Sequence, residues 1–109
     1  MREPNTPTAA ELALLDPDGS FIRRLAEDQA VLAALGAGPF DDGALAGIQL
    51  LAHRLAGAAG TFGHAAVGAA ALDLEEGVID LRDGRGTSAA ISRRLAVLLA
   101  ALDAALRLK

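Results

Sequence analysis

One histidine stands out as a residue that could do chemistry. His53 lies in the segment 52–63, AHRLAGAAGTFG, whose glycines must interrupt a helix. At about 100° per residue, the apolar residues before and after it fall on one stripe: Leu45, Ile48, Leu51, Ala52, Leu55, Ala59 and Phe62. His53 lies well over a right angle from the middle of that stripe, so the spacing predicts an imidazole facing solvent. Such a ring is mostly neutral near pH 7 and can attack a phosphoryl group through one nitrogen.

Small residues surround this histidine on the predicted outer face. A glycine inside a helix costs about 1 kcal/mol relative to alanine, so Gly57, one turn after His53, indicates a requirement other than helix stability. Room for another protein to close over the imidazole is one such requirement. We therefore expect a docking surface made of Ala46, Gln49, Leu50, Ala56 and Gly57.

The elements that must position His53 are helices. A capping box at Thr8 and Glu11 predicts a short helix over residues 9–15. Ser20 is the expected N-cap of a first long helix to about residue 35, and a second starts near residue 41 or 42 and stops around 60–63. A third covers 65–82, and Thr87 or Ser88 caps a fourth. Apolar residues recur at 4-3-4-3 spacing in the last two helices: Val67, Ala71, Leu74, Val78 and Leu81, then Ile91, Leu95, Leu98, Leu102 and Ala105.

This pattern predicts an all-α fold, an antiparallel up-and-down four-helix bundle with a short extra N-terminal helix. Residues 1–19 would form the N-terminal segment and residues 20–109 the bundle. At 109 residues the chain is one domain. A net charge of −4 and the lack of a basic face argue against nucleic acid, and the lack of cysteine excludes disulfides and thiolate metal sites. No long apolar run or signal-peptide pattern occurs, so we expect a cytoplasmic protein without a membrane segment.

The residues around His53 resemble the histidine-phosphotransfer (HPt) domains of multistep phosphorelays. That family's pattern is roughly His-x-Leu-Lys-Gly, small residues, a further glycine, and then a helix with Leu-Glu. The matching residues are His53, Leu55, Gly57, Gly60, Gly63, Leu74 and Glu75. The resemblance covers about residues 20 to 108.

The resemblance implies a phosphocarrier and not an enzyme with catalysis of its own. His53 would be phosphorylated at Nε2 in exchange with an aspartate of a receiver domain, from a response regulator or a hybrid histidine kinase. That receiver would supply Mg²⁺, so we expect neither a cofactor nor a metal on this chain, which would act as a monomer. The alternative is a phosphorylation-independent binding module that docks a receiver, or another signalling protein, through the same face.

The family's lysine, three residues after the histidine, is replaced here by Ala56. In one interpretation another cation takes its place, and Arg54 is the nearest in sequence, although it lies about 100° around the helix from His53. In the other interpretation the partner supplies all the positive charge.

Other polar residues have simpler interpretations. His64 is expected to be a polar residue near a helix end, without a metal shared with His53. Phe62 would close the end of the bundle, and Asp28, near the inner edge of its helix, would either help fix the register or stay exposed. The acidic residues of the third predicted helix would form a solvated face: Asp73, Glu75, Glu76 and Asp80.

Overall fold

The computed structural model describes residues 7–107, and within that range it contains five α-helices and no strand. The first six residues of the predicted N-terminal segment and the last two of the predicted bundle lie outside the described residues. The all-helical prediction is confirmed. The helices are α1 (Ala9–Leu15), α2 (Ser20–Ala37), α3 (Asp42–Ala58), α4 (Ala65–Arg82) and α5 (Ser88–Arg107).

Most helix ends lie where their capping residues predict. The capping box of α1 is present, with Thr8 and Glu11 bonded to each other's backbone N–H groups. The Asp41 carboxylate accepts from the backbone N–H of Ala44 at 2.8 Å and begins α3. Thr87 Oγ1 accepts from the backbone N–H of Ala90 at 3.1 Å and begins α5.

The start of α2 differs from the prediction. Ser20 is not the N-cap but the first helical residue, and it follows Gly19, whose φ of 70° is in the left-handed region. The carboxylate of Asp16 accepts from the backbone N–H groups of Phe21 at 3.1 Å and Ile22 at 3.0 Å. A carboxylate from the preceding turn therefore satisfies the first turn of α2, which cap positions alone do not predict.

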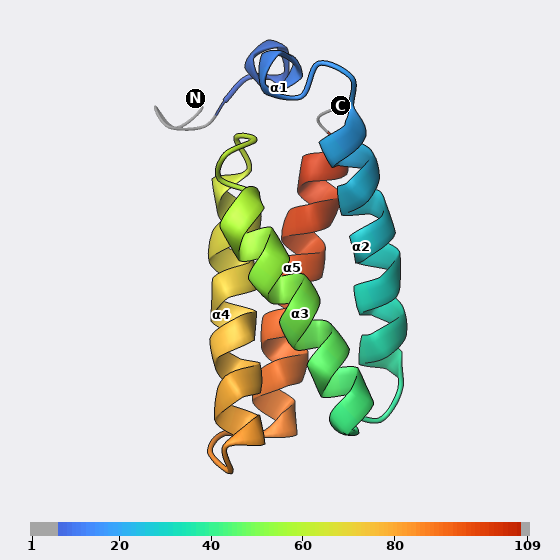
Figure 1. The fold of residues 1–109 in the computed structure, drawn as a ribbon, viewed down its shortest axis with the longest axis vertical. Helices are drawn as coiled ribbons and strands as arrows, with labels where there is room; N and C mark the ends of the chain where they lie inside the picture. The colour runs from blue at the N-terminus through green and yellow to red at the C-terminus, as the bar shows by residue number, and fades with distance from the viewer. Residues whose placement is uncertain (1–6, 108–109) are drawn as a thin grey trace.

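The four long helices lie side by side, and each contacts the next in the chain, while α5 also contacts α2. In Figure 1 the chain descends α2, ascends α3, descends α4 and ascends α5. Helix α1 lies across the end of the bundle where α2 begins and α5 ends (Figure 1). Residues 59–64 join α3 to α4, and these two helices pack against each other.

The core follows the predicted apolar stripes closely. Leu81, part of the predicted seam, is only partly buried near the end of α4, and Leu35 is likewise partly buried near the end of α2. Phe62 stacks on Phe21 with ring centroids 4.2 Å apart and so helps close the end of the bundle. The largest fully buried side chains come from all four long helices: Leu25, Leu32, Ile48, Leu55, Leu74, Ile91, Leu98, Leu102, Val67 and Val78.

Asp28 of α2 is a polar residue within this core. It is buried among the helices, and one carboxylate oxygen, Oδ2, has no hydrogen-bond partner in the described part of the chain. Burial raises the pKa of Asp28, and the nearby positive charges of Arg54 and Arg24 oppose this rise. Of the two interpretations of Asp28, plain exposure is therefore wrong.

Candidate functional site

His53 projects from the outer face of α3, as the helical spacing predicts. Its side chain is 72% exposed, while its neighbours on the opposite face of the helix, among them Ala52 and Leu55, are buried. The imidazole is therefore accessible to a macromolecular partner.

One nitrogen of this imidazole is held by the neighbouring helix. Nδ1 of His53 lies 2.7 Å from Oε2 of Glu75 on α4, and the Glu75 side chain is only 14% exposed. Because an ionised carboxylate can only accept a hydrogen bond, Nδ1 carries the proton. Nε2 then has the free lone pair. The contact thus selects the tautomer whose nucleophilic atom is the nitrogen farther from the backbone.

The prediction that the acidic residues of α4 form a solvated face is wrong for Glu75. Glu75 lies on the side of α4 that faces α3, because its carboxylate contacts His53 of that helix. Asp73 instead faces α5, where its carboxylate lies 3.7 Å from Nε of Arg94. Asp73 and Glu76 are both exposed, and Asp80 is partly exposed, so the predicted solvated face is found for these three residues. In the sequence, the match of Leu74 and Glu75 to the Leu-Glu of the HPt pattern is the signal that sets Glu75 apart from the other acidic residues of α4.

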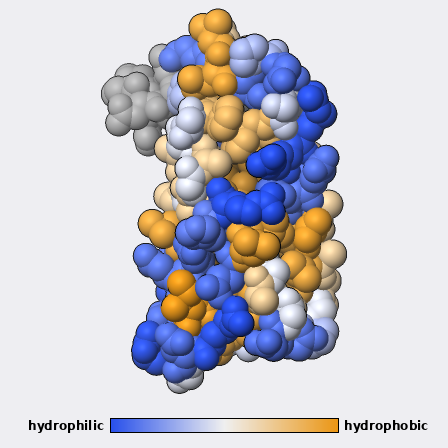
Figure 2. Space-filling view, viewed as in Figure 1, coloured by the Kyte–Doolittle hydropathy of each residue, from blue (hydrophilic) through white to orange (hydrophobic). Residues whose placement is uncertain are grey.

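The surface next to His53 is open over several of the predicted docking residues. Ala46 and Gly57 are exposed, and Leu50, one of several large apolar side chains that the described helices expose, is 57% exposed. A Cβ atom added at Gly57 would have no heavy atom within 4 Å. Figure 2, which looks onto α3, shows apolar side chains among polar ones on this face. A transient interface is about as apolar as the rest of a protein surface, so this composition agrees with docking but does not by itself mark the site.

The two other predicted docking residues are partly occupied within the chain. Ala56 packs against the core. Gln49 is half-buried, and its Oε1 accepts a hydrogen bond from Nη1 of Arg82, the last residue of α4, at 2.8 Å. Gln49 therefore belongs to a second contact between α3 and α4, below the one at His53.

Arg54 lies on the other side of α3. Its charge acts on the buried Asp28 of α2, as does that of Arg24. Arg54, the predicted phosphoryl-stabilising cation, thus interacts with a residue of α2. His53 is instead hydrogen-bonded to a residue of α4.

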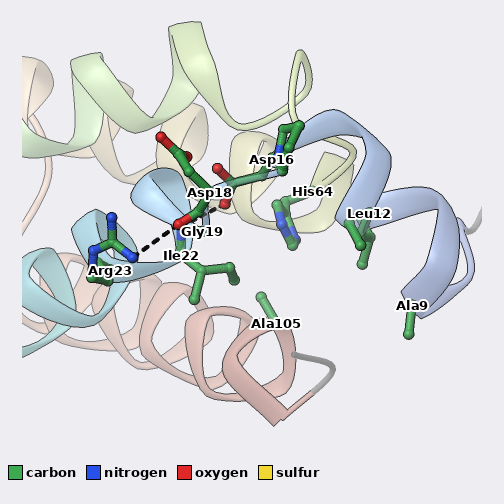
Figure 3. A pocket seen from close by; sticks show the side chains of 11 residues that line it. Ala9, Leu12, Asp16, Asp18, Gly19, Ile22, Arg23, His64 and Ala105 are labelled. Carbon is green, nitrogen blue, oxygen red and sulfur yellow. Dashed lines mark hydrogen bonds between the residues drawn. The ribbon is translucent and has the colours of Figure 1, made fainter.

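A separate cavity of about 470 Å³ lies under α1 at the end of the bundle. Figure 3 shows the imidazole of His64 pointing into it between α1 and Ala105 of α5. Arg23 at its rim donates from Nη1 to the carbonyl oxygen of Asp18 at 3.0 Å. The cavity includes neither His53 nor Glu75, so it is distinct from the candidate site.

His64 is more buried than a polar residue at a helix end needs to be. Gly63, with a φ of 88°, turns the chain so that His64 precedes α4 and its ring lies 6.0 Å from that of Phe21. Burial lowers the pKa of His64, and the charge of Asp16 only partly opposes this. The imidazole is therefore neutral in the folded protein at neutral pH.

This burial predicts a loss of stability in acid. An unfolded histidine takes up a proton below about pH 6.5, but the folded protein resists protonation until lower pH. The free energy of unfolding should therefore fall as the pH drops below that value, by at most about 1.4 kcal/mol per pH unit from this group. Urea unfolding between about pH 7.5 and about pH 5.5 measures it. His64→Phe should remove this part of the dependence; an unchanged dependence would contradict the assignment.

Within residues 7–107 no cluster of three or more histidine, cysteine or acidic side chains could hold a metal ion. None of the described helices is long and apolar enough to cross a membrane.

Comparison with models of known protein families shows to which family this helical bundle belongs. The family model described as the Hpt domain matches residues 19–107, which includes all four long helices, His53 and Glu75. The chain belongs to the Hpt domain family. No curated protein and no solved structure matches the chain. Hpt domains carry phosphoryl groups on histidine in phosphorelays and interact with receiver domains.

Proposed function

We propose that this Hpt domain is a phosphocarrier that exchanges a phosphoryl group between His53 and the aspartate of a receiver domain. The observation that carries the proposal is the pairing of an exposed imidazole with a carboxylate at one nitrogen only. The hydrogen bond from Nδ1 to Glu75 leaves Nε2 free, on a face where Gly57 leaves space for a partner.

The transfer step follows from this geometry. The lone pair of Nε2 attacks the phosphorus of an aspartyl phosphate, the new N–P bond forms, and the P–O bond to the aspartate breaks. The receiver aspartate leaves as a carboxylate. No proton has to move, because Nδ1 keeps its hydrogen, and the positive charge that develops on the ring lies beside the Glu75 carboxylate. The reverse step returns the phosphoryl group to an aspartate.

In this proposal His53 is the nucleophile or the leaving group, and the Hpt domain needs no catalytic machinery beyond it. Phosphoryl transfer depends mainly on in-line positioning and on stabilisation of charge. The receiver, from a response regulator or a hybrid histidine kinase, would provide the acceptor aspartate and Mg²⁺. The Hpt domain would act as a monomer in the cytoplasm, presenting Ala46, Leu50 and Gly57 around the reactive ring.

The test is transfer of label from a radiolabelled phosphorylated receiver. Wild type should take up label that is lost in acid and kept in base, as expected for phosphohistidine. His53→Gln should take up none, while its circular dichroism and thermal unfolding match wild type. Equal uptake by the two proteins would refute the assignment of His53.

A phosphorylation-independent binding module is the second candidate, and the exposure of Leu50 favours it. In that case the same face binds a receiver and His53 is only a contact residue. Leu50→Asp should then abolish binding of the unphosphorylated receiver, whereas His53→Gln leaves both binding and signalling output intact. Loss of signalling in His53→Gln with binding retained supports the phosphocarrier.

A further inference from the structure

A cation of α4 contacts the residue of α3 that lies one helical turn before His53. Arg82 donates from Nη1 to Oε1 of Gln49 at 2.8 Å, and its Nη2 lies 3.5 Å from Oδ1 of Asp42. The Arg82 side chain is 35% exposed, while that of Asp42 is 92% exposed. The guanidinium is thus oriented by an amide and only loosely paired with a surface carboxylate.

Two contacts between α3 and α4 place this guanidinium about one helical turn from the reactive ring. Gln49 precedes His53 by one helical turn, a rise of about 6 Å. On α4, Arg82 follows Glu75 by two turns, which keeps both side chains on the side that faces α3. The hydrogen bonds His53–Glu75 and Gln49–Arg82 therefore lie one below the other along the same groove between the helices.

Other arginines of the described chain are engaged away from this groove. Arg54 acts on Asp28 at the α2 side of α3. Several more are bound to other groups: Arg23 to the Asp18 carbonyl, Arg85 to Asp80 and Asp83, Arg94 to Asp73, and Arg107 to Asp103. Arg82 is thus the arginine that the structure ties to the His53 side of the α3–α4 groove.

We infer that Arg82 is a positioning residue that pairs with a carboxylate at the rim of the incoming receiver. The inference rests on the proposed function. A domain that holds Mg²⁺ beside an acceptor aspartate must gather carboxylates there, and this chain has a net charge of −4, so its negative charge opposes the approach of that acidic site. A cation one helical turn from His53 offsets this repulsion where the surfaces meet.

The present pairing of Arg82 suits such an exchange. An ion pair with a carboxylate as exposed as that of Asp42 contributes roughly 0 to 1 kcal/mol, so a partner carboxylate can replace Asp42 at little cost. The hydrogen bond to Gln49 can persist during this exchange, because it uses Nη1 while the Asp42 contact uses Nη2. Gln49 would then contribute to docking through Arg82.

The experiment compares wild type, Arg82→Ala and Arg93→Ala in transfer from the phosphorylated receiver. Arg93 is an exposed residue of α5, whose backbone is not adjacent to that of α3, so its replacement makes the same change in net charge elsewhere. At an ionic strength of about 20 mM we expect Arg82→Ala to slow transfer by about 3- to 10-fold. The difference should shrink toward none at about 500 mM, and Arg93→Ala should follow wild type throughout.

Two further measurements separate docking from other roles of Arg82. Phosphoramidate, whose phosphoryl group passes to an imidazole nitrogen as its P–N bond breaks and ammonia leaves, should label His53 equally in wild type and Arg82→Ala. Binding of the unphosphorylated receiver should weaken in Arg82→Ala at low salt only. This binding result holds even if no transfer occurs, so failure of the inference is distinguishable from failure of the proposed function.

Several outcomes would overturn the inference. Equal rates and equal receiver binding for Arg82→Ala and wild type at low salt would show that Arg82 makes no contact with the partner. Slowing that is the same at all salt concentrations and is accompanied by a lower melting temperature would indicate a structural role. Slower labelling by phosphoramidate would place Arg82 on the phosphoryl group instead of the receiver.

Discussion

Glu75→Gln is expected to slow phosphoryl transfer to His53 by about 10-fold, because a neutral amide cannot balance the charge that develops on the ring. Hydrogen bonds to charged groups contribute roughly 1.5 to 3 kcal/mol, and each 1.4 kcal/mol is a factor of about ten in rate. Since the His53 side chain is 72% exposed, water screens part of this interaction, and the lower end of the range applies. Glu75→Ala, which also frees the ring to rotate, should have a larger effect.

Rapid-quench measurement of transfer from the phosphorylated receiver checks this expectation. Glu76→Gln is the matched control, because it removes the same charge from the next residue of α4, whose side chain is exposed. If Glu75→Gln and Glu76→Gln react at the same rate, the hydrogen bond to Nδ1 does not contribute to transfer. A complete loss in Glu75→Gln would instead mean that the charge of this carboxylate is indispensable to transfer.

Gly57→Leu should reduce transfer from the receiver by about 10-fold or more without destabilising the fold, since docking over His53 needs a close approach. A Cβ atom at position 57 meets nothing within 4 Å, so the leucine side chain would project into solvent where the partner must lie. Replacing a helical glycine should also raise the free energy of unfolding, by about 0.5 to 1 kcal/mol. Lower activity and higher stability are expected in the same variant.

Urea unfolding and transfer kinetics on the same preparations test both parts. Gly57→Ala should gain the stability and lose less activity, because its side chain is small. Ala100→Leu places the same leucine on the exposed face of α5 and should leave transfer unchanged. Full activity in Gly57→Leu would show that the receiver does not approach over this residue, and the docking surface would have to be placed elsewhere.

Features that depend on one helix alone were predictable from the sequence. The outward direction of His53 and the buried stripe of α3 follow from a period of about 3.6 residues. The capping residues Thr8 and Asp41 are equally local, since each contacts a residue three positions later. Such features need no knowledge of how the helices pack.

Features that depend on two helices could not be predicted, because the sequence does not specify how the helices pack against each other. Glu75 and Arg82 meet residues of α3 only because the two helices pack with a particular vertical offset, which the spacing within either helix does not specify. The burial of His64 likewise depends on a glycine turn and on a helix lying across the end of the bundle. The predicted cation, Arg54, is adjacent to His53 in sequence, whereas Arg82 comes within one helical turn of His53 only through the packing of α4 on α3.

The short link at residues 59–64 has a consequence for the evolution of such sites. Its length determines which residue of α4 lies at the same height as His53 of α3. Adding or removing one residue at the start of α4 would advance or retard that helix by about 1.5 Å and rotate it by about 100°. A different side chain would then meet Nδ1. Variation in loop length among proteins of this kind should therefore be accompanied by a shift in the position of the carboxylate, so that the distance along the chain between histidine and acid changes while their meeting point does not.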